Sequence, residues 1–205
     1  MYKTVLNEAT AEIIEKNSRF IASVKPVTTK EEAEAFIEEI RAKNRTANHN
    51  VYAYVLRENN YQKHSDDGEP GGTAGMPVLN VLLKQELTDA VIVVTRYFGG
   101  VLLGTGGLVR AYSASAALGV SNAQAVSMCE HTVFKIKCSY DKYSLVMSAM
   151  SSAGAISENA EFTDAVEVTG YILSENFESF EKNLVNQSNG TVFAEKEFEK
   201  FLPIK

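Results

Sequence analysis

The segment from His64 to Pro77 concentrates groups that can bind or transform a ligand. Within a dozen residues it places three carboxylates beside four glycines, so exposed backbone N–H groups are expected near acidic side chains. The acids could direct a metal ion or a water at a substrate, or they could pair with cations of the same chain. The candidate residues of this first glycine-rich segment are Asp66, Asp67, Glu69, Gly72, Thr73 and Gly75.

A second glycine-rich segment, from Thr95 to Ser113, also contains two arginines. Glycines let a backbone approach a ligand closely, and the free N–H groups and the dipole of a helix start favour negative charge. Arg96 and Arg110 add forked hydrogen-bond donors on either side. We therefore predict an anion site that includes Arg96, Gly99, Gly100, Gly104, Thr105, Gly106, Gly107 and Arg110.

No familiar phosphate signature explains these two segments. A dinucleotide fingerprint beginning at Gly104 would need glycine where Val109 stands, and the chain has no Gly-Lys-Ser/Thr of a P-loop. The alternative interpretation is structural: the glycines would serve tight turns and close helix–sheet packing, and the arginines would pair with Asp66, Asp67 or Glu69. Arginine pairing and anion binding can also coexist.

Metal and covalent chemistry find little support in the spacing of the residues. His49 and His64 with Asp66 and Asp67 would supply imidazole and carboxylate ligands, but not at the spacing of a known metal motif. The two cysteines stand nine positions apart without a CxxC pair, and no Gly-x-Ser-x-Gly sequence is present. We therefore expect no catalytic residue, no metal, no other cofactor and no disulfide, with His49 in a supporting role at the anion site.

Composition restricts the partners of the chain. It has 205 residues and a net charge of −6, which argues against strong sequence-independent binding of nucleic acid. The chain up to Glu130 contains 13 basic and 15 acidic residues and the remainder contains 7 and 11, so the first part is the better candidate for binding an anion. No apolar run reaches the roughly 18 residues of a transmembrane helix, and no signal-peptide pattern is present. We expect a cytoplasmic protein with no membrane partner and no DNA specificity.

Hydrophobic periodicity predicts an α+β chain. Residues 28–44 have apolar side chains at helical spacing behind a capping box, and the unbroken apolar run 91–94 indicates a strand buried on both faces. Strands are predicted at 19–25, 50–58 and 89–97, and two further helices open near Gly75 and Thr105.

The last third of the chain has shorter elements in the order β-α-β-β-α-β, which is the ferredoxin-like plan. The predicted elements are a strand at 132–139, a helix at 141–153, strands at 155–162 and 165–173, a helix at 175–186 and a strand at 191–201. Small polar residues cluster between Ser121 and Glu130. We therefore predict two domains, at 1–125 and 131–205.

The two glycine-rich segments together resemble the signature of the IMPACT family, in its bacterial YigZ-type form. The resemblance is found in Asp66–Pro70 with Gly72–Gly75, and in Val94–Gly100 with Leu103–Tyr112. His49–Ala53 is similar to the histidine strand of the family, although many members have cysteine where this chain has Val51. The resemblance extends over essentially the whole chain, because bacterial members also append a small second domain.

The resemblance implies a fold and a field of function. The first domain would have the βαβ fold with a left-handed crossover that a small-subunit ribosomal protein shares with the fourth domain of elongation factor G. The second domain would resemble the fifth domain of that factor. Eukaryotic relatives are linked to translational control under amino-acid starvation through a protein partner.

Three hypotheses about function remain open. In the first hypothesis, the chain is a non-catalytic regulatory or binding protein of translation or its stress control. It contacts RNA, the ribosome or a translation-related protein through the two glycine-rich loops. Alternatively, it is an enzyme that acts on a phosphorylated small molecule or an RNA phosphodiester. In the third hypothesis it binds only proteins and the loops are structural. The carboxylates of Asp66, Asp67 and Glu69 discriminate between the binding and enzyme hypotheses. An enzyme that acts on phosphate needs one of them directed at a metal ion or a water molecule.

Overall fold

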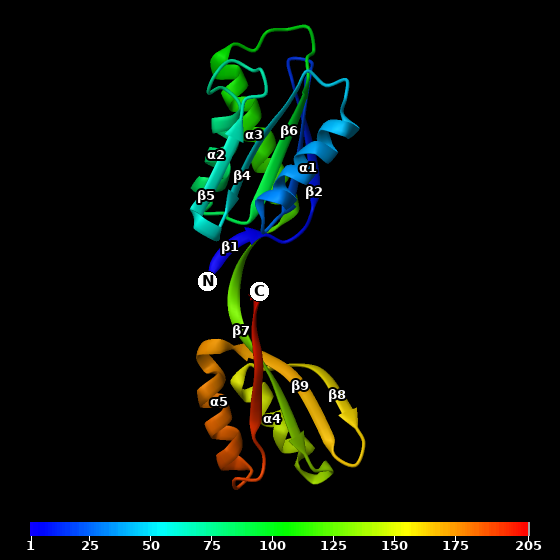
Figure 1. Cartoon of the computed structure of the whole chain (residues 1–205), viewed down its shortest axis with the longest axis vertical. Helices are drawn as coiled ribbons and strands as arrows, with labels where there is room; N and C mark the ends of the chain where they lie inside the picture. The colour runs from blue at the N-terminus through cyan, green and yellow to red at the C-terminus, as the bar shows by residue number, and fades with distance from the viewer. Residues whose placement is uncertain (205) are drawn as a thin grey trace. The chain divides into compact units, whose positions relative to one another are not determined.

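The structure is a computed structural model that describes residues 1–204 and contains two compact units (Figure 1). The first unit is Tyr2–Ser127, and the second contains Met1 and the chain from Met128 onward. The described residues form two antiparallel sheets and five α-helices. This arrangement agrees with the α+β class predicted from the sequence.

The first unit is built on a five-stranded sheet with the strand order β2–β3–β6–β4–β5. Its strands are β2 (Ala9–Glu15), β3 (Ser18–Pro26), β4 (His49–Leu56), β5 (Tyr61–Ser65) and β6 (Ala90–Tyr97), preceded by the short strand β1 (Tyr2–Val5). Its helices are α1 (Lys30–Lys43), α2 (Gly75–Lys84) and α3 (Thr105–Ala123).

Helices cover both faces of this sheet. On central strand β6, Val91 and Val93 belong to the apolar cluster that α1 completes, whereas Ile92 and Val94 belong to the cluster formed with α2 and α3. All four side chains are fully buried. The prediction of a strand buried on both faces is therefore confirmed.

Helix α1 begins at the predicted capping box. The Glu32 amide donates to the Thr29 hydroxyl at 3.2 Å, and the Thr29 amide donates to the Glu32 carboxylate at 3.3 Å. The hydrogen bonds from the backbone and side chain of Thr28 are the larger cause of a lowered pKa of Glu32. The two reciprocal bonds satisfy amides that a helix start would otherwise leave unpaired.

Two features of the first unit differ from the sequence prediction. Strands β1, β2 and β5 were not predicted; β2 and β5 are edge strands, which leave many side chains in solvent, such as Ile14 at 68% exposed. The predicted boundary region is also more regular than expected, since α3 continues to Ala123 and the next strand begins at Ala125. Its polar residues Ser121 and Asn122 lie on the exposed side of the last helical turn.

The second unit follows the order β-α-β-β-α-β. Its elements are β7 (Ala125–Cys138), α4 (Tyr143–Ala153), β8 (Ile156–Phe162), β9 (Val166–Leu173), α5 (Ser174–Gln187) and β10 (Ala194–Pro203). The strands lie in the order β10–β7–β9–β8, and both helices share one apolar core with the sheet. The buried Cys138 belongs to this core, and both cysteines are free thiols.

Four loops of the first unit meet at one end of its sheet, at the top of Figure 1. Strand β6 is antiparallel to β3 and β4, so Arg96 near its end lies opposite Phe20 and His49 near their starts. Strand β5 is antiparallel to β4 and ends at the same edge. The loops that follow β5 and β6 lead into α2 and α3 at this same end. We call this end of the sheet, with its loops, the loop end of the first unit.

Candidate functional site

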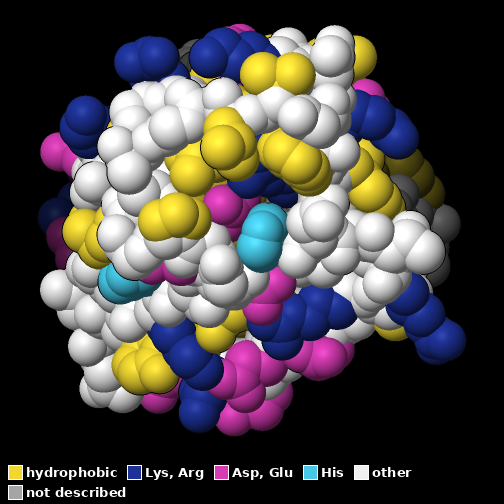
Figure 2. Space-filling model, turned by 90° about the horizontal axis from the view of Figure 1, so that it is seen from above, with side chains coloured by type: hydrophobic (Ala, Val, Ile, Leu, Met, Phe, Trp, Pro, Cys, Tyr) yellow, Lys and Arg dark blue, Asp and Glu magenta, His cyan; other side chains and the backbone are white. Residues whose placement is uncertain are grey.

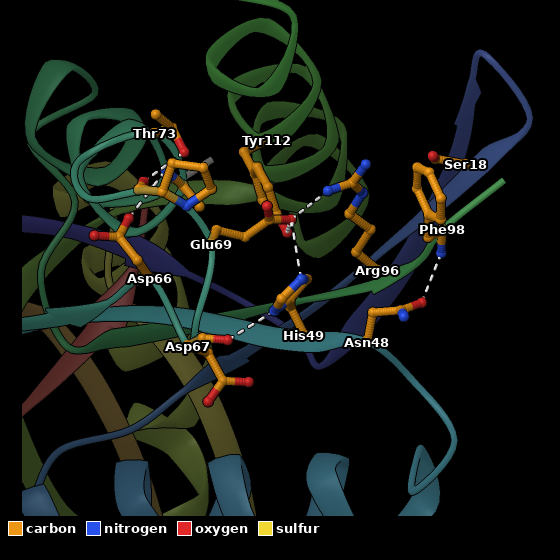
Figure 3. Close-up of polar contacts among 12 residues, drawn as sticks. Ser18, Asn48, His49, Asp66, Asp67, Glu69, Thr73, Arg96, Phe98 and Tyr112 are labelled. Atoms are coloured by element: carbon orange, nitrogen blue, oxygen red, sulfur yellow. Dashed lines mark hydrogen bonds and ion pairs between the residues drawn. The ribbon is translucent and has the colours of Figure 1, made fainter. Parts of the chain in front are cut away.

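Arg96 is buried at the loop end because of strand alternation. It lies two residues beyond Val94 on β6, so its side chain shares the face that α2 and α3 cover, and it is only 5% exposed. Its guanidinium Nη1 donates to Glu69 Oε1 at 2.6 Å (Figure 3). The rings of Phe20 and Phe98 lie near the guanidinium, with their centroids 5.4 and 5.5 Å from its Cζ.

Glu69 is the acceptor around which this site is arranged. Besides Arg96, the Tyr112 hydroxyl of α3 donates to Glu69 Oε1 at 2.7 Å, and His49 Nε2 of β4 lies 3.8 Å from the same oxygen. The Glu69 side chain is 3% exposed. Burial, and then the hydrogen bond to the Glu69 carboxylate, raise the pKa of Tyr112 far above its usual range. The hydroxyl therefore remains a donor at neutral pH.

The orientation of His49 is fixed by the first glycine-rich segment. Its Nδ1 lies 2.8 Å from the carbonyl oxygen of Asp67, and because a carbonyl only accepts, Nδ1 must hold a proton. Nε2 consequently points toward Glu69 (Figure 3). The structure thus places His49 between Asp67 and Glu69, and its supporting role in binding an anion stays a prediction.

Asp66 occupies the start of α2. Its carboxylate accepts hydrogen bonds from the amides of Gly72 at 2.8 Å, Ala74 at 3.0 Å and Gly75 at 2.8 Å. Burial acts to raise the pKa of Asp66, but the three amide hydrogen bonds outweigh it and hold the pKa below its usual value. The place where an external anion would bind at this helix is thus taken by the chain itself.

Asp67 is also compensated within the protein. One of its carboxylate oxygens lies 3.1 Å from Arg41 Nη2, and the other accepts from the Asn50 amide at 2.6 Å. Arg41 lies in the last turn of α1, so this contact ties the first glycine-rich segment to a helix on the opposite face of the sheet. All three acids of the segment are therefore engaged in contacts inside the protein.

The start of α3 is arranged differently from that of α2. Its N-cap residue is Gly104, at φ +73°, which provides no side-chain cap. Among the described residues, the amides of Thr105, Gly106 and Gly107 have no hydrogen-bond acceptor. A Cβ added to Gly106 would lie 3.6 Å from Arg110 Nη1, so the exposed Arg110 side chain folds back along the first turn.

The two arginines of the second segment thus have different environments. The sequence allowed either of them to pair with Asp66, Asp67 or Glu69; Arg96 pairs with Glu69, whereas Arg110 has no ion-pair partner in the described part of the chain. The buried stripe of α3 includes Leu108, Ala111, Tyr112 and Ser115, and Arg110 lies outside this stripe.

The loop between β6 and α3 is held by side chains that sequence reasoning missed. The Phe98 amide donates to Asn48 Oδ1 at 2.8 Å (Figure 3). The Gly99 amide donates to Ser18 Oγ at 3.1 Å. A Cβ on Gly99 would lie 2.0 Å from the carbonyl carbon of Asn17, so glycine is required there by close approach. Gly100, at φ +83°, is required by backbone conformation.

Figure 2 shows this end of the molecule as a hollow. Acidic, basic and histidine side chains lie inside it, and hydrophobic side chains form part of its border. The exposed hydrophobic residues of the second glycine-rich segment are Phe98, Val101, Leu102 and Val109. Polar groups at the bottom and apolar groups at the border are typical of ligand sites.

Comparison with known proteins places this site in a family. Residues 16–120 match the Impact N-terminal domain, and residues 136–191 match a domain of unknown function (DUF1949). The IMPACT family member YvyE of Bacillus subtilis is 36% identical over 190 residues, which cover 92% of this chain and 88% of that protein. The chain belongs to the IMPACT family. This confirms the resemblance found in the two glycine-rich segments.

Other relatives match this IMPACT family chain over different shares of its length. The IMPACT family member YigZ of Escherichia coli is 30% identical over 180 residues, covering 86% of this chain and 88% of that protein. A Saccharomyces cerevisiae protein named Protein IMPACT homolog is 32% identical over 98 residues, covering 45% and 37%. A solved structure entitled "Crystal structure of an hypothetical protein" has a TM-score of 0.59 at 28% identity and covers 96% of this chain and 97% of its own.

Within residues 1–204, no group of three or more His, Cys, Asp and Glu side chains is arranged to hold a metal ion. No helix in this range is long and apolar enough to cross a membrane.

We expect Arg96→Ala to lower the free energy of unfolding by roughly 3–5 kcal/mol, because it leaves the Glu69 carboxylate buried without its cation. Chemical denaturation of the purified variant measures this. Arg19→Ala is the matched control, since Arg19 also pairs with a carboxylate, Glu12, but in solvent. A change at Arg96 no larger than that at Arg19 would contradict the structural role of the ion pair.

We expect Asp66→Ala to destabilise the protein by about 1–2 kcal/mol at pH 7, the cost of losing a helix cap. The native pKa of Asp66 is lowered, so its contribution is fully present above the unfolded pKa of about 3.9 and disappears as pH falls through the native value. The stability difference between wild type and variant should therefore shrink in acid. Asp66→Asn keeps an acceptor oxygen but should lack this pH dependence; a difference constant from pH 7 to pH 3 would contradict the assignment.

Proposed function

We propose that this chain is a non-catalytic binding protein of translation or its stress control, and that its first unit binds RNA at the loop end. A phosphate group of the RNA would accept hydrogen bonds from the amides at the start of α3. Arg110, folded back along the first helical turn, would contribute the charge. The RNA would be ribosomal RNA or another RNA of the translation apparatus. The chain would act in the cytoplasm.

One observation favours this proposal above the others. Helices α2 and α3 start at the same end, and among the described residues only the amides at the start of α2 have a hydrogen-bond acceptor. The Asp66 carboxylate accepts hydrogen bonds from amides at the start of α2. The amides of Thr105, Gly106 and Gly107 have no acceptor among the described residues. A helix start without an acceptor, beside an exposed arginine, is suited to an anion from outside the chain.

The distribution of charge at the loop end also supports an anionic partner. Arg110 and two further cations in neighbouring loops, Lys16 and Arg45, have no ion-pair partner among residues 1–204. The acids Asp66, Asp67 and Glu69 each accept at least two contacts from donors of the chain. The overall charge of −6 therefore does not describe this end.

Enzyme function has less support because of where the carboxylates point. An enzyme acting on a phosphorylated small molecule or an RNA phosphodiester would need an acid directed at a metal or a water. Here Asp66 caps a helix, Asp67 binds Arg41 and the Asn50 amide, and Glu69 binds Arg96 and Tyr112. A role limited to protein partners would leave the amides of α3 unexplained.

The proposal extends to the folds of the two units. The order β-α-β-β-α-β and the strand order β10–β7–β9–β8 support a ferredoxin-like second unit similar to the fifth domain of elongation factor G. The first unit would share the fold of a small-subunit ribosomal protein and of the fourth domain of that factor. Both comparisons are with components of the translation apparatus.

We expect Arg110→Ala to weaken binding of a single-stranded RNA oligomer by about 1.5–3 kcal/mol, because a charge-assisted hydrogen bond to phosphate is lost. The slope of log K against log salt should fall by about one. Fluorescence anisotropy at two salt concentrations measures both quantities. Lys30→Ala, at the start of α1, is the control and should change neither.

The same experiment separates the alternatives. Affinity that is unaltered in Arg110→Ala would contradict the phosphate site at α3. Turnover of the RNA oligomer by the wild type would favour the enzyme hypothesis instead, because the proposed binding protein leaves its ligand intact.

A further inference from the structure

Phe98 is an aromatic residue held rigidly in an otherwise exposed loop. Its own amide is bound by the Asn48 side chain and the next amide by Ser18, at 2.8 and 3.1 Å. Gly99 is wedged so closely against Asn17 that no side chain fits there. The backbone on both sides of the Phe98 ring is therefore fixed by other parts of the fold.

The Phe98 ring lies beside a buried cation but remains partly exposed. The buried guanidinium of Arg96 lies 5.5 Å from the ring centroid, and Glu69 fixes that guanidinium in place. The residue is nevertheless 44% exposed. An aromatic ring that is already immobilised loses little entropy when a planar group packs on its exposed face.

We propose that Phe98 is a stacking platform for an unpaired nucleobase, so that the RNA bound at the loop end is single-stranded. This inference rests on the proposed function. Phe98 begins the loop that leads into Thr105, so one loop would bind both a base and a phosphate of the same strand. In a duplex the bases stack on one another and do not offer a free face to a side chain.

The charge of the loop end favours RNA over a protein as the partner on this ring. Val101 and Leu102 of the same loop are exposed apolar residues, which by themselves single out neither kind of partner. Within residues 1–204, the amides at the start of α3 have no acceptor and the cations Lys16 and Arg110 have no ion-pair partner. These groups match a polyanion, which a strand of RNA provides at every nucleotide.

Three probes of equal length test the proposal on the full chain: a single-stranded RNA oligomer, a ribose-phosphate oligomer without bases, and a blunt RNA duplex. We expect the single strand to bind most tightly. Phe98→Leu should weaken single-strand binding about 10-fold and leave the affinity for the oligomer without bases unchanged, because only the stacked base is lost. Leu102→Ala, at a residue 82% exposed in the same loop, is the control and should weaken neither.

A spectroscopic variant makes the test independent of affinity. The chain contains no tryptophan, so Phe98→Trp introduces a single indole at the proposed platform. It should retain single-strand binding, and its fluorescence should be quenched by the single strand but not by the oligomer without bases. Thermal melting of each variant verifies that it is folded.

The outcomes distinguish this inference from the function on which it rests. Equal binding of all three probes, unaffected by Phe98→Leu, would overturn the stacking platform and leave the phosphate site intact. An equal loss in Leu102→Ala and Phe98→Leu would also overturn it, since a general apolar patch would then explain the contact. Absence of binding to every probe by the wild type would overturn both proposals.

Discussion

The buried ion pair between Glu69 and Arg96 is the interaction on which the loop end of the first unit depends. It joins the loop before α2 to the end of β6, and Tyr112 adds a hydrogen bond from α3 to the same carboxylate oxygen. Removing two charges from water costs several kcal/mol for each ion, which good geometry and additional hydrogen bonds must offset. Because the donors come from separate elements, the pair fixes the positions of both glycine-rich segments relative to the sheet.

Internal compensation of the acids gives this acidic chain an end suited to an anion. Asp66, Asp67 and Glu69 would repel phosphate if they were exposed and unpaired, but each is engaged by donors of the chain. The same arrangement explains why two neighbouring helix starts differ. The start of α2 holds a carboxylate of the chain, whereas that of α3 has a glycine N-cap and leaves its amides available.

Periodicity in the sequence was sufficient to predict β6 and α3, which position Arg96 and Tyr112, but not strand β5 or the contacts within the site. Alternation along β6 places Arg96 on the covered face with Val94, and the helical stripe of α3 includes Tyr112 and excludes Arg110. The choice of Glu69 as the partner of Arg96 depends on the path of an irregular loop, in which Asp67 has φ +45° and Gly68 has φ +86°. Asn48 and Ser18 act across 50 and 81 residues of sequence, on backbone amides rather than on side chains, and no local pattern indicates such contacts.

The central claim is that the start of α3, and not that of α2, receives the phosphate of a single-stranded RNA. Amide chemical shifts followed by nuclear magnetic resonance during titration with an RNA oligomer test it most directly. The amides of Thr105, Gly106 and Gly107 should shift and saturate, while those of Ala74 and Gly75 should stay in place because Asp66 already binds them. Saturating shifts elsewhere with none at Thr105, Gly106 and Gly107 would contradict the account.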